Sequence, residues 1–159
     1  MKVYLQFDIG VGDAVTPAPE LSEYPVILNF AVPLLRIYPK VTAIAEKTKT
    51  MVTLGLVNSR MKDFADILVL QRNFRFDYDL LKTAINRPLA RYGIDMPIDV
   101  PLCFADTFAS SPAKQTQWTP FCRKAGISDL PSHFTDVVAE CGGFLHPLLF
   151  PPSPSPQYL

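Results

Sequence analysis

Two neighbouring stretches of the chain carry side chains that could handle a phosphate group. Lys47 lies in an expected helix over residues 41–54, and a glycine-containing turn leads into a second expected helix. An ammonium group fixed on a rigid helix can neutralise phosphate charge without reorganising. We therefore expect Lys47 and Asp63 to converge on a shared hollow, with Asp8 on a nearby strand as an accessory carboxylate. The second helix carries Arg60, Asp63 and Asp66.

Each of these residues also has an ordinary structural explanation. A helical lysine usually lays its stem along the surface and keeps its ammonium in water. An acid such as Asp63 near a helix start complements the helix dipole. Arg60, Asp63 and Asp66 are also neighbours on one helix surface, as in exposed ion-pair strips worth under ~1 kcal/mol. Residue types and spacing alone leave both interpretations open.

Composition excludes several classes of protein. The chain has 159 residues, 48% of them hydrophobic, which suits one domain, or one domain plus part of another, with a real core. Its 15 basic and 15 acidic residues give no net charge, so we expect no extended DNA binding. A local pocket for one nucleotide or one RNA end remains compatible with this charge balance.

The cysteine, histidine and apolar patterns point to the cytoplasm. Three cysteines are widely separated without a Cys-x-x-Cys pair, and neither histidine has metal-ligand spacing with them. We therefore expect no zinc site and no disulfide framework, as in a reducing compartment. No apolar run reaches the ~18 residues of a membrane span, so no membrane insertion is expected. The three cysteines are Cys103, Cys122 and Cys141.

The element pattern predicts an α+β fold, with a short N-terminal β ribbon followed by a mainly α-helical bundle. Alternation predicts a first strand over residues 3–9, with Asp8 on its polar face. Prolines between residues 20 and 40 favour short edge strands, including 24–28 and 33–37. Helical spacing then predicts a buried stripe in 41–54 and inward-facing residues in the second helix. Those inward-facing residues are Met61, Phe64, Ala65 and Leu68.

Local signals predict where the later helices begin and end. Asn58 or Ser59 could cap the second helix, and Asp77 the third. A short helix is expected near 102–108, another over 114–124 interrupted by Pro120, and a last one starting at Ser128-Asp129. The end of the chain is a Pro/Ser-rich tail without packing ability.

Three of these stretches taken together resemble the AbiEii-type nucleotidyltransferases, the toxin half of an abortive-infection, type IV toxin–antitoxin system. The similarity continues weakly through 72–74, 81–85 and 118–124, so it covers most of the chain up to about the last helix. The three stretches are 5–10 with Gly12-Asp13, then Tyr38-Pro39 leading to Ala45-Glu46-Lys47, then Asn58 to Asp66.

The resemblance implies transfer of a nucleotidyl group from a nucleoside triphosphate to an acceptor such as tRNA. It implies that Lys47 contacts the triphosphate, that Asp63 is a catalytic carboxylate, and that Arg60 and Asp66 support it. Asp8 would flank the metal site as a candidate Mg²⁺ ligand. It further implies a cognate antitoxin as a partner. By domain, 1–38 would be a remnant of a nucleotidyltransferase domain, 39–148 a helical domain and 149–159 the tail.

One motif of that family is absent from these 159 residues. The family's first motif is a Gly-Ser turn followed by an Asp-x-Asp pair that binds magnesium, and no Gly-Ser dipeptide occurs here. The only Asp-x-Asp, at residues 77–79, opens a helix far downstream. We therefore expect a C-terminal portion that is incomplete or inactive alone and needs Mg²⁺ and a nucleoside triphosphate once the upstream half is supplied. The alternative is a non-catalytic helical module that binds a partner protein or an RNA end.

Overall fold

The computed structural model describes residues 2–5, 15–127 and 129–150, and within them it has an antiparallel β ribbon followed by six α-helices. The α+β fold with a ribbon and then helices, as expected from the sequence, is confirmed. The strands are β1 (Glu20–Glu23) and β2 (Leu34–Ile37). The helices are α1 (Lys40–Leu54), α2 (Met61–Asn73), α3 (Tyr78–Arg91), α4 (Asp106–Ala109), α5 (Pro112–Ala125) and α6 (Phe134–Leu149), with 3₁₀ turns η1 (Gly55–Val57) and η2 (Leu102–Phe104).

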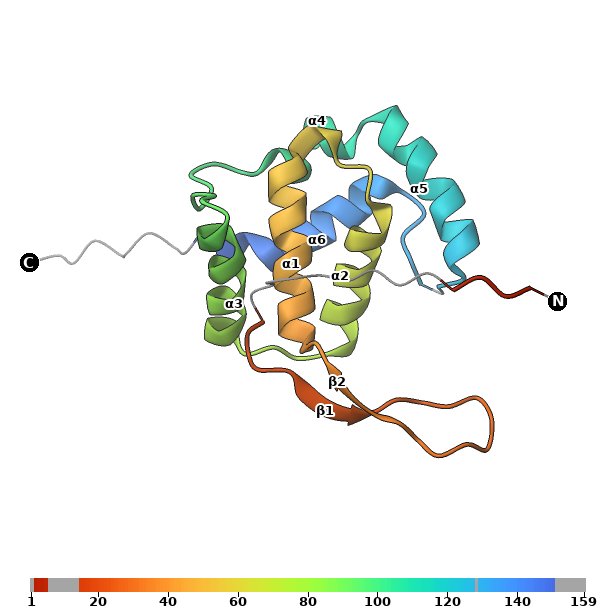
Figure 1. The fold of residues 1–159 in the computed structure, drawn as a ribbon. Helices are drawn as coiled ribbons and strands as arrows, with labels where there is room; N and C mark the ends of the chain where they lie inside the picture. Colours follow the sequence, from red (N-terminus) through yellow and green to blue (C-terminus); the bar gives the residue numbers. More distant parts are fainter. Residues whose placement is uncertain (1, 6–14, 128, 151–159) are drawn as a thin grey trace, which may run out of the picture.

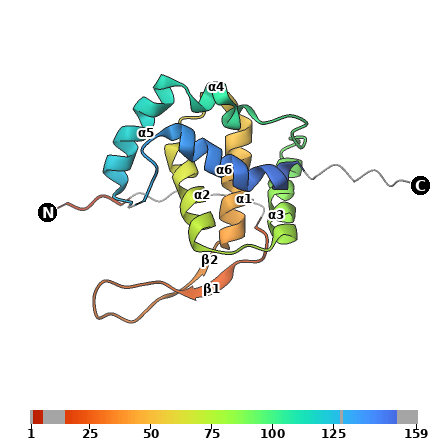
Figure 2. The ribbon, with the colours of Figure 1, turned by 180° about the vertical axis from the view of Figure 1, so that it is seen from behind.

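The helices form a two-sided arrangement around α1. Figure 1 shows α1 between α3 and α2, and α1 packs against both. From behind, α6 crosses the same group, and it packs against α2, α3, α4 and α5 (Figure 2). Among the described residues, no helix is long and apolar enough to cross a membrane.

The core is built from the faces that helical spacing predicts. In α1 the side chains of Ile44 and Met51 are fully buried, and the predicted inward-facing residues of α2 are buried as well. An aromatic cluster fills the centre: the Phe64 ring lies 5.2 Å from Phe134 and 5.9 Å from Phe108, measured between centroids. Burying such rings is a main source of stability in a domain of this size.

The ribbon projects below the helices, with its loop directed away from them (Figure 1). Its register runs from Glu20 opposite Ile37 to Glu23 opposite Leu34. The strand expected at 33–37 is confirmed as β2, which begins one residue later. The strand expected at 24–28 is wrong, because those residues lie in the loop. Tyr24 N–H donates to Pro33 O at 2.9 Å and closes the ladder. Pro25 follows without an N–H and cannot extend it.

The predicted first strand is not formed where the structure describes it. Residues 2–5 are exposed and make no strand, and the rest of that prediction, Asp8 included, lies outside the described residues. Alternation supplies a face but no hydrogen-bonding partner, which a strand also needs. The chain is anchored again at Thr16, whose N–H donates to Thr42 Oγ1 at 3.0 Å and whose hydroxyl accepts from Arg87 at 2.7 Å.

Several predicted helix ends need correction. Neither Asn58 nor Ser59 caps α2, because Arg60 holds the N-cap position without a side-chain cap. The last helix begins at Phe134 rather than at 128–129; Asp129 has φ 71°, a left-handed conformation that a helix cannot contain. Pro120 does not interrupt α5, because a helix can continue past a proline when its packing compensates for the missing hydrogen bond. The cap by Asp77 is confirmed, since its Oδ1 accepts from Leu80 N–H at 2.7 Å.

Candidate functional site

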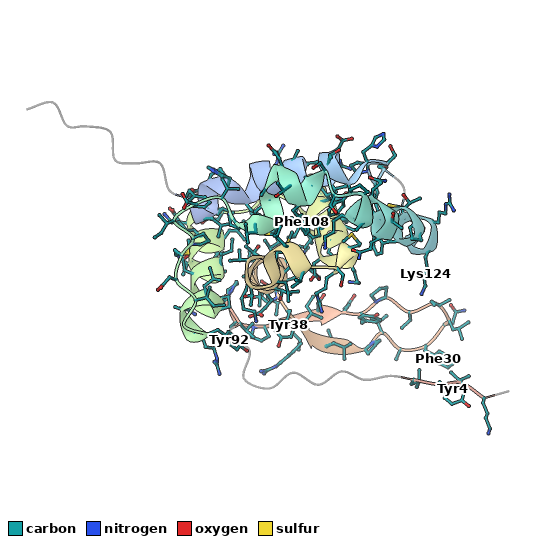
Figure 3. All side chains as sticks on the ribbon, turned by 90° about the horizontal axis from the view of Figure 1, so that it is seen from above. Tyr4, Phe30, Tyr38, Tyr92, Phe108 and Lys124 are labelled. Atoms are coloured by element: carbon teal, nitrogen blue, oxygen red, sulfur yellow. The ribbon has the colours of Figure 1, made fainter. Side chains whose placement is uncertain are left out.

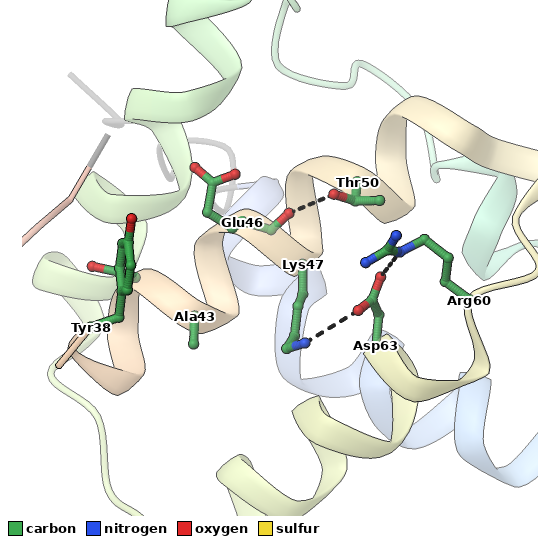
Figure 4. Close-up of a pocket in the computed structure, with 8 residues that line it drawn as sticks. Tyr38, Ala43, Glu46, Lys47, Thr50, Arg60 and Asp63 are labelled. Carbon is green, nitrogen blue, oxygen red and sulfur yellow. Dashed lines mark hydrogen bonds and ion pairs between the residues drawn. The ribbon is translucent and has the colours of Figure 1, made fainter. Parts of the chain in front are cut away.

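Lys47 of α1 and Asp63 of α2 form an ion pair between the two helices. Lys47 Nζ lies 3.2 Å from Asp63 Oδ1 and 2.6 Å from Asp66 Oδ2. Both carboxylates reach the same ammonium because they stand one turn apart on α2. Figure 4 shows the Lys47 side chain extending toward Asp63. The structure thus brings together the two helices that the sequence pattern paired.

Asp63 is ion-paired with both Lys47 and Arg60. Its side chain is 2% exposed, and its second oxygen, Oδ2, accepts from Arg60 Nε at 2.6 Å. That hydrogen bond and the nearby charge raise the pKa of the Arg60 guanidinium above its ordinary value. Because each carboxylate oxygen is engaged by a cation, Asp63 fixes the positions of Lys47 and Arg60 relative to each other (Figure 4).

Asp66 adds a second, less buried carboxylate. Burial acts to raise its pKa, but hydrogen bonds from Lys47 and Lys62 outweigh burial and leave the pKa below its ordinary value. Lys62 Nζ lies 2.7 Å from Asp66 Oδ2, with the lysine side chain 72% exposed. Asp66 therefore stays ionised at neutral pH and holds Lys47 from the far side.

A pocket of about 410 Å³ opens in front of this cluster. Glu46 Oε1 is buried without a hydrogen-bond partner in the described part of the chain, and Glu46 Oε2 accepts from Lys49 at 2.6 Å. The Arg60 side chain is 59% exposed, and its two terminal nitrogens make no hydrogen bond to any described residue. The pocket therefore combines free N–H donors on Arg60 with the carboxylates of Glu46 and Asp63. Its lining consists of Tyr38, Thr42, Ala43, Glu46, Lys47, Thr50, Arg60 and Asp63.

A buried lysine that the sequence analysis did not single out is linked to the site through Asn58. Lys114 of α5 is 8% exposed and donates from Nζ to Asn58 O at 2.6 Å. Burial lowers its pKa, and the Phe108 ring lies 4.7 Å away as a cation–π partner. Asn58 Oδ1 in turn accepts from Arg60 N–H at 2.9 Å. The four-residue spacing from Lys114 to Trp118 is the signal that could have placed this lysine on the buried face.

The described residues do not fit a magnesium site. Within residues 2–5, 15–127 and 129–150, no group of three or more His, Cys, Asp or Glu side chains is placed to hold a metal ion. Both carboxylate oxygens of Asp63 and the Oδ2 of Asp66 are bound by lysine or arginine. Asp8, the predicted metal ligand, lies outside the described residues and its role stays a prediction.

Comparison with known proteins gives a family but no individual relative. No curated protein and no solved structure matches the chain significantly. A family profile described as the nucleotidyl transferase AbiEii toxin of a type IV toxin–antitoxin system matches residues 1–140, which include the whole Lys47–Asp63–Asp66 cluster and Arg60. This span covers most of the 159 residues, so the chain belongs to the AbiEii nucleotidyltransferase toxin family.

Proposed function

We propose that this chain takes part in transferring a nucleotidyl group from a nucleoside triphosphate to an acceptor such as tRNA, in the cytoplasm, and that the pocket beside Lys47 holds the triphosphate. The observation that carries the proposal is the sharing of Asp63 by two cations, Lys47 and Arg60, at the wall of one pocket. Phosphate oxygens are acceptors that both cations can reach with the N–H groups that they do not use on carboxylates.

The hydrogen-bonding capacity of the two cations supports this proposal. An ammonium has three protons, and Lys47 uses two of them on Asp63 and Asp66, which leaves one for a phosphate oxygen. Arg60 uses Nε on Asp63 and keeps its terminal nitrogens for a bidentate contact. In this scheme Lys47 and Arg60 touch the triphosphate, and Asp63 acts as a positioning residue that keeps both cations in place.

The metal would come from elsewhere. The resemblance implies Mg²⁺, which neutralises charge during nucleotidyl transfer when it is bound. The described residues do not fit it, and no Gly-Ser turn with an Asp-x-Asp pair occurs among the 159 residues. We propose that transfer depends on an element that carries this pair, whether in the same polypeptide or supplied by another.

Binding of ATP, measured by calorimetry without added metal, tests the pocket. Lys47→Ala should weaken ATP binding at least about tenfold, since it removes one of the two phosphate-facing cations. The matched control is Lys40→Ala, in the first turn of the same helix, because the Lys40 ammonium lies over the Phe74 ring and does not line the pocket. Equal affinities in both variants, or no ATP binding by the intact chain, would contradict the proposal.

A second candidate is a non-catalytic module that binds the cognate antitoxin, a partner that this family suggests. It is favoured by the ribbon, where apolar side chains such as Ile27 and Phe30 are 101% and 72% exposed. Exposed apolar patches of this kind mark protein-binding surfaces. The same titration separates the two candidates, because the module predicts no ATP binding.

A further inference from the structure

A second hollow, of about 500 Å³, shares a wall with the candidate triphosphate pocket. Arg60 and Asp63 line both, so the Arg60–Asp63 pair is common to the two hollows. The remaining lining comes from the start of α2 and from one face of α5. It consists of Ser59, Met61, Lys62, Gln117 and Phe121.

The α5 side of this hollow combines a flat aromatic ring with a free amide. Phe121 stacks on Trp118, with centroids 5.4 Å apart and planes 29° apart. Trp118 is itself fully buried, and its Nε1–H donates to Pro131 O at 2.8 Å, which fixes the ring that supports Phe121. Gln117 is exposed one turn earlier, and its amide makes no hydrogen bond within the described residues.

The cations at this hollow are charge-compensated but keep unused N–H donors for an anion. Arg60 pairs with Asp63 through Nε, and Lys62 pairs with Asp66. Arg60 and Lys62 lie on the α2 side, and Lys124 stands one turn beyond Phe121 as an exposed residue of α5 (Figure 3). The only carboxylate in the lining, Asp63, is 2% exposed and is already bound by two cations. An aromatic face, an amide and cationic N–H donors together form the usual recognition set for a single-stranded nucleotide.

We propose that this second hollow binds the terminal nucleotide of a single-stranded RNA acceptor. The base would stack on Phe121, Gln117 would hydrogen-bond its edge, and Lys62 would contact the adjoining phosphate. This inference rests on the proposed function, because a triphosphate in the first pocket would then lie across the Arg60–Asp63 pair from the end of the acceptor. It assigns acceptor recognition to α5, on which the proposed triphosphate pocket has no residue.

A fluorescently labelled, six-nucleotide single-stranded RNA, titrated at low salt with the full chain, tests the inference. Gln117→Glu should weaken binding at least about fivefold, because it places a negative charge in the hollow without altering the fold. Phe121→Leu keeps most of the side-chain volume and removes the flat ring, and should weaken binding about tenfold. The matched control is Thr116→Glu, which adds the same charge at an exposed α5 position outside the hollow and should retain most of the affinity.

Measuring ATP binding in parallel separates this inference from the proposed function. Gln117→Glu should bind ATP as the unmodified chain does, since Gln117 does not line the first pocket. In one outcome the chain binds RNA, the Gln117 and Phe121 variants bind RNA more weakly, and ATP does not bind. That result supports the acceptor hollow and contradicts the proposed triphosphate pocket. RNA binding that is absent, or equal in Gln117→Glu, Phe121→Leu and Thr116→Glu, overturns the inference whatever the ATP result.

Discussion

The helical body, residues 40–149, and the β ribbon, residues 20–37, contain similar apolar residues but treat them in opposite ways. In the body, Phe64 and Trp118 are fully buried. In the ribbon, Leu21 is 64% exposed and Ile27 is 101% exposed. Seen from above, Phe108 lies among the helices whereas Phe30 lies at the far end of the ribbon loop (Figure 3). Hydrophobic content alone therefore does not decide whether a segment is buried.

The register of the ribbon explains the difference. Residues directly opposite each other share a face, and Leu21 faces Arg36 while Ser22 faces Leu35. Each face therefore mixes polar and apolar side chains, whereas each helix of the body gathers its apolar residues on one side. Two strands alone also leave two edges unpaired, which makes such a ribbon marginally stable at best. The body has a core of its own, whereas the described residues of the ribbon have none.

Hydrogen exchange should show the largest contrast between the two regions. Amides in α1, α2 and α6 should exchange only through near-global unfolding, and those of β1 and β2 through local opening that costs almost no free energy. We expect the ribbon amides to exchange at least about 1,000-fold faster, as measured by mass spectrometry on the chain alone. Equal protection would show that the ribbon is stabilised by contacts of its own.

Truncating one apolar side chain in each region should change the free energy of unfolding by very different amounts. Phe64→Ala should lower the free energy of unfolding by about 3–5 kcal/mol, because it opens a cavity between the Phe108 and Phe134 rings. Ile27→Ala removes a side chain that is 101% exposed, so it should change the free energy of unfolding by less than about 0.5 kcal/mol. Urea unfolding followed by circular dichroism measures both. A loss of several kcal/mol in Ile27→Ala would place that residue in a core.

The sequence predicted the body better than the ribbon for the same reason. Helical periodicity identifies a buried face without reference to any partner, which is why the interior sides of α1 and α2 were predicted correctly. Periodicity did not by itself predict that Lys47 would meet Asp63, because spacing alone also allowed an exposed ion-pair strip. The resemblance to the family favoured that pairing, and the structure contains it. Strand position depends on which segment pairs with which, so the strand expected at 24–28 proved to be loop, with β1 at Glu20–Glu23.

What the sequence could not supply are contacts between distant segments. Lys114 lies 56 residues from the Asn58 carbonyl that it binds, and nothing near either residue indicates the pairing. A sequence pattern predicted a helix start at Ser128-Asp129, but the chain takes a left-handed turn at Asp129 and then meets Pro131 before α6 begins. The Asp129 carbonyl oxygen accepts a hydrogen bond from Arg72 of α2 at 2.6 Å, and only tertiary packing determines this contact.

The smallest expected effect is the loss of stability in acid, and it should arise from Asp66 in the helical body. Folding lowers the pKa of Asp66, so its contribution to stability is present above the ordinary pKa of about 4 and is lost as pH falls through the lowered value. The free energy of unfolding should therefore decline below about pH 4. The amide in Asp66→Asn cannot ionise. The free energy of unfolding of this variant should therefore fall less steeply over that pH range, by the amount that Asp66 contributes.

The magnitude of this effect is bounded by the surroundings of Asp66. Its side chain is 25% exposed and one of its two lysine partners, Lys62, is 72% exposed, so water screens much of the attraction. We expect the two unfolding curves to differ by no more than about 1 kcal/mol at neutral pH and to converge near pH 2. Parallel curves from pH 6 to pH 2 would mean that Lys47 is held by Asp63 alone, and the fixed spacing of the two pocket cations would then rest entirely on that one carboxylate.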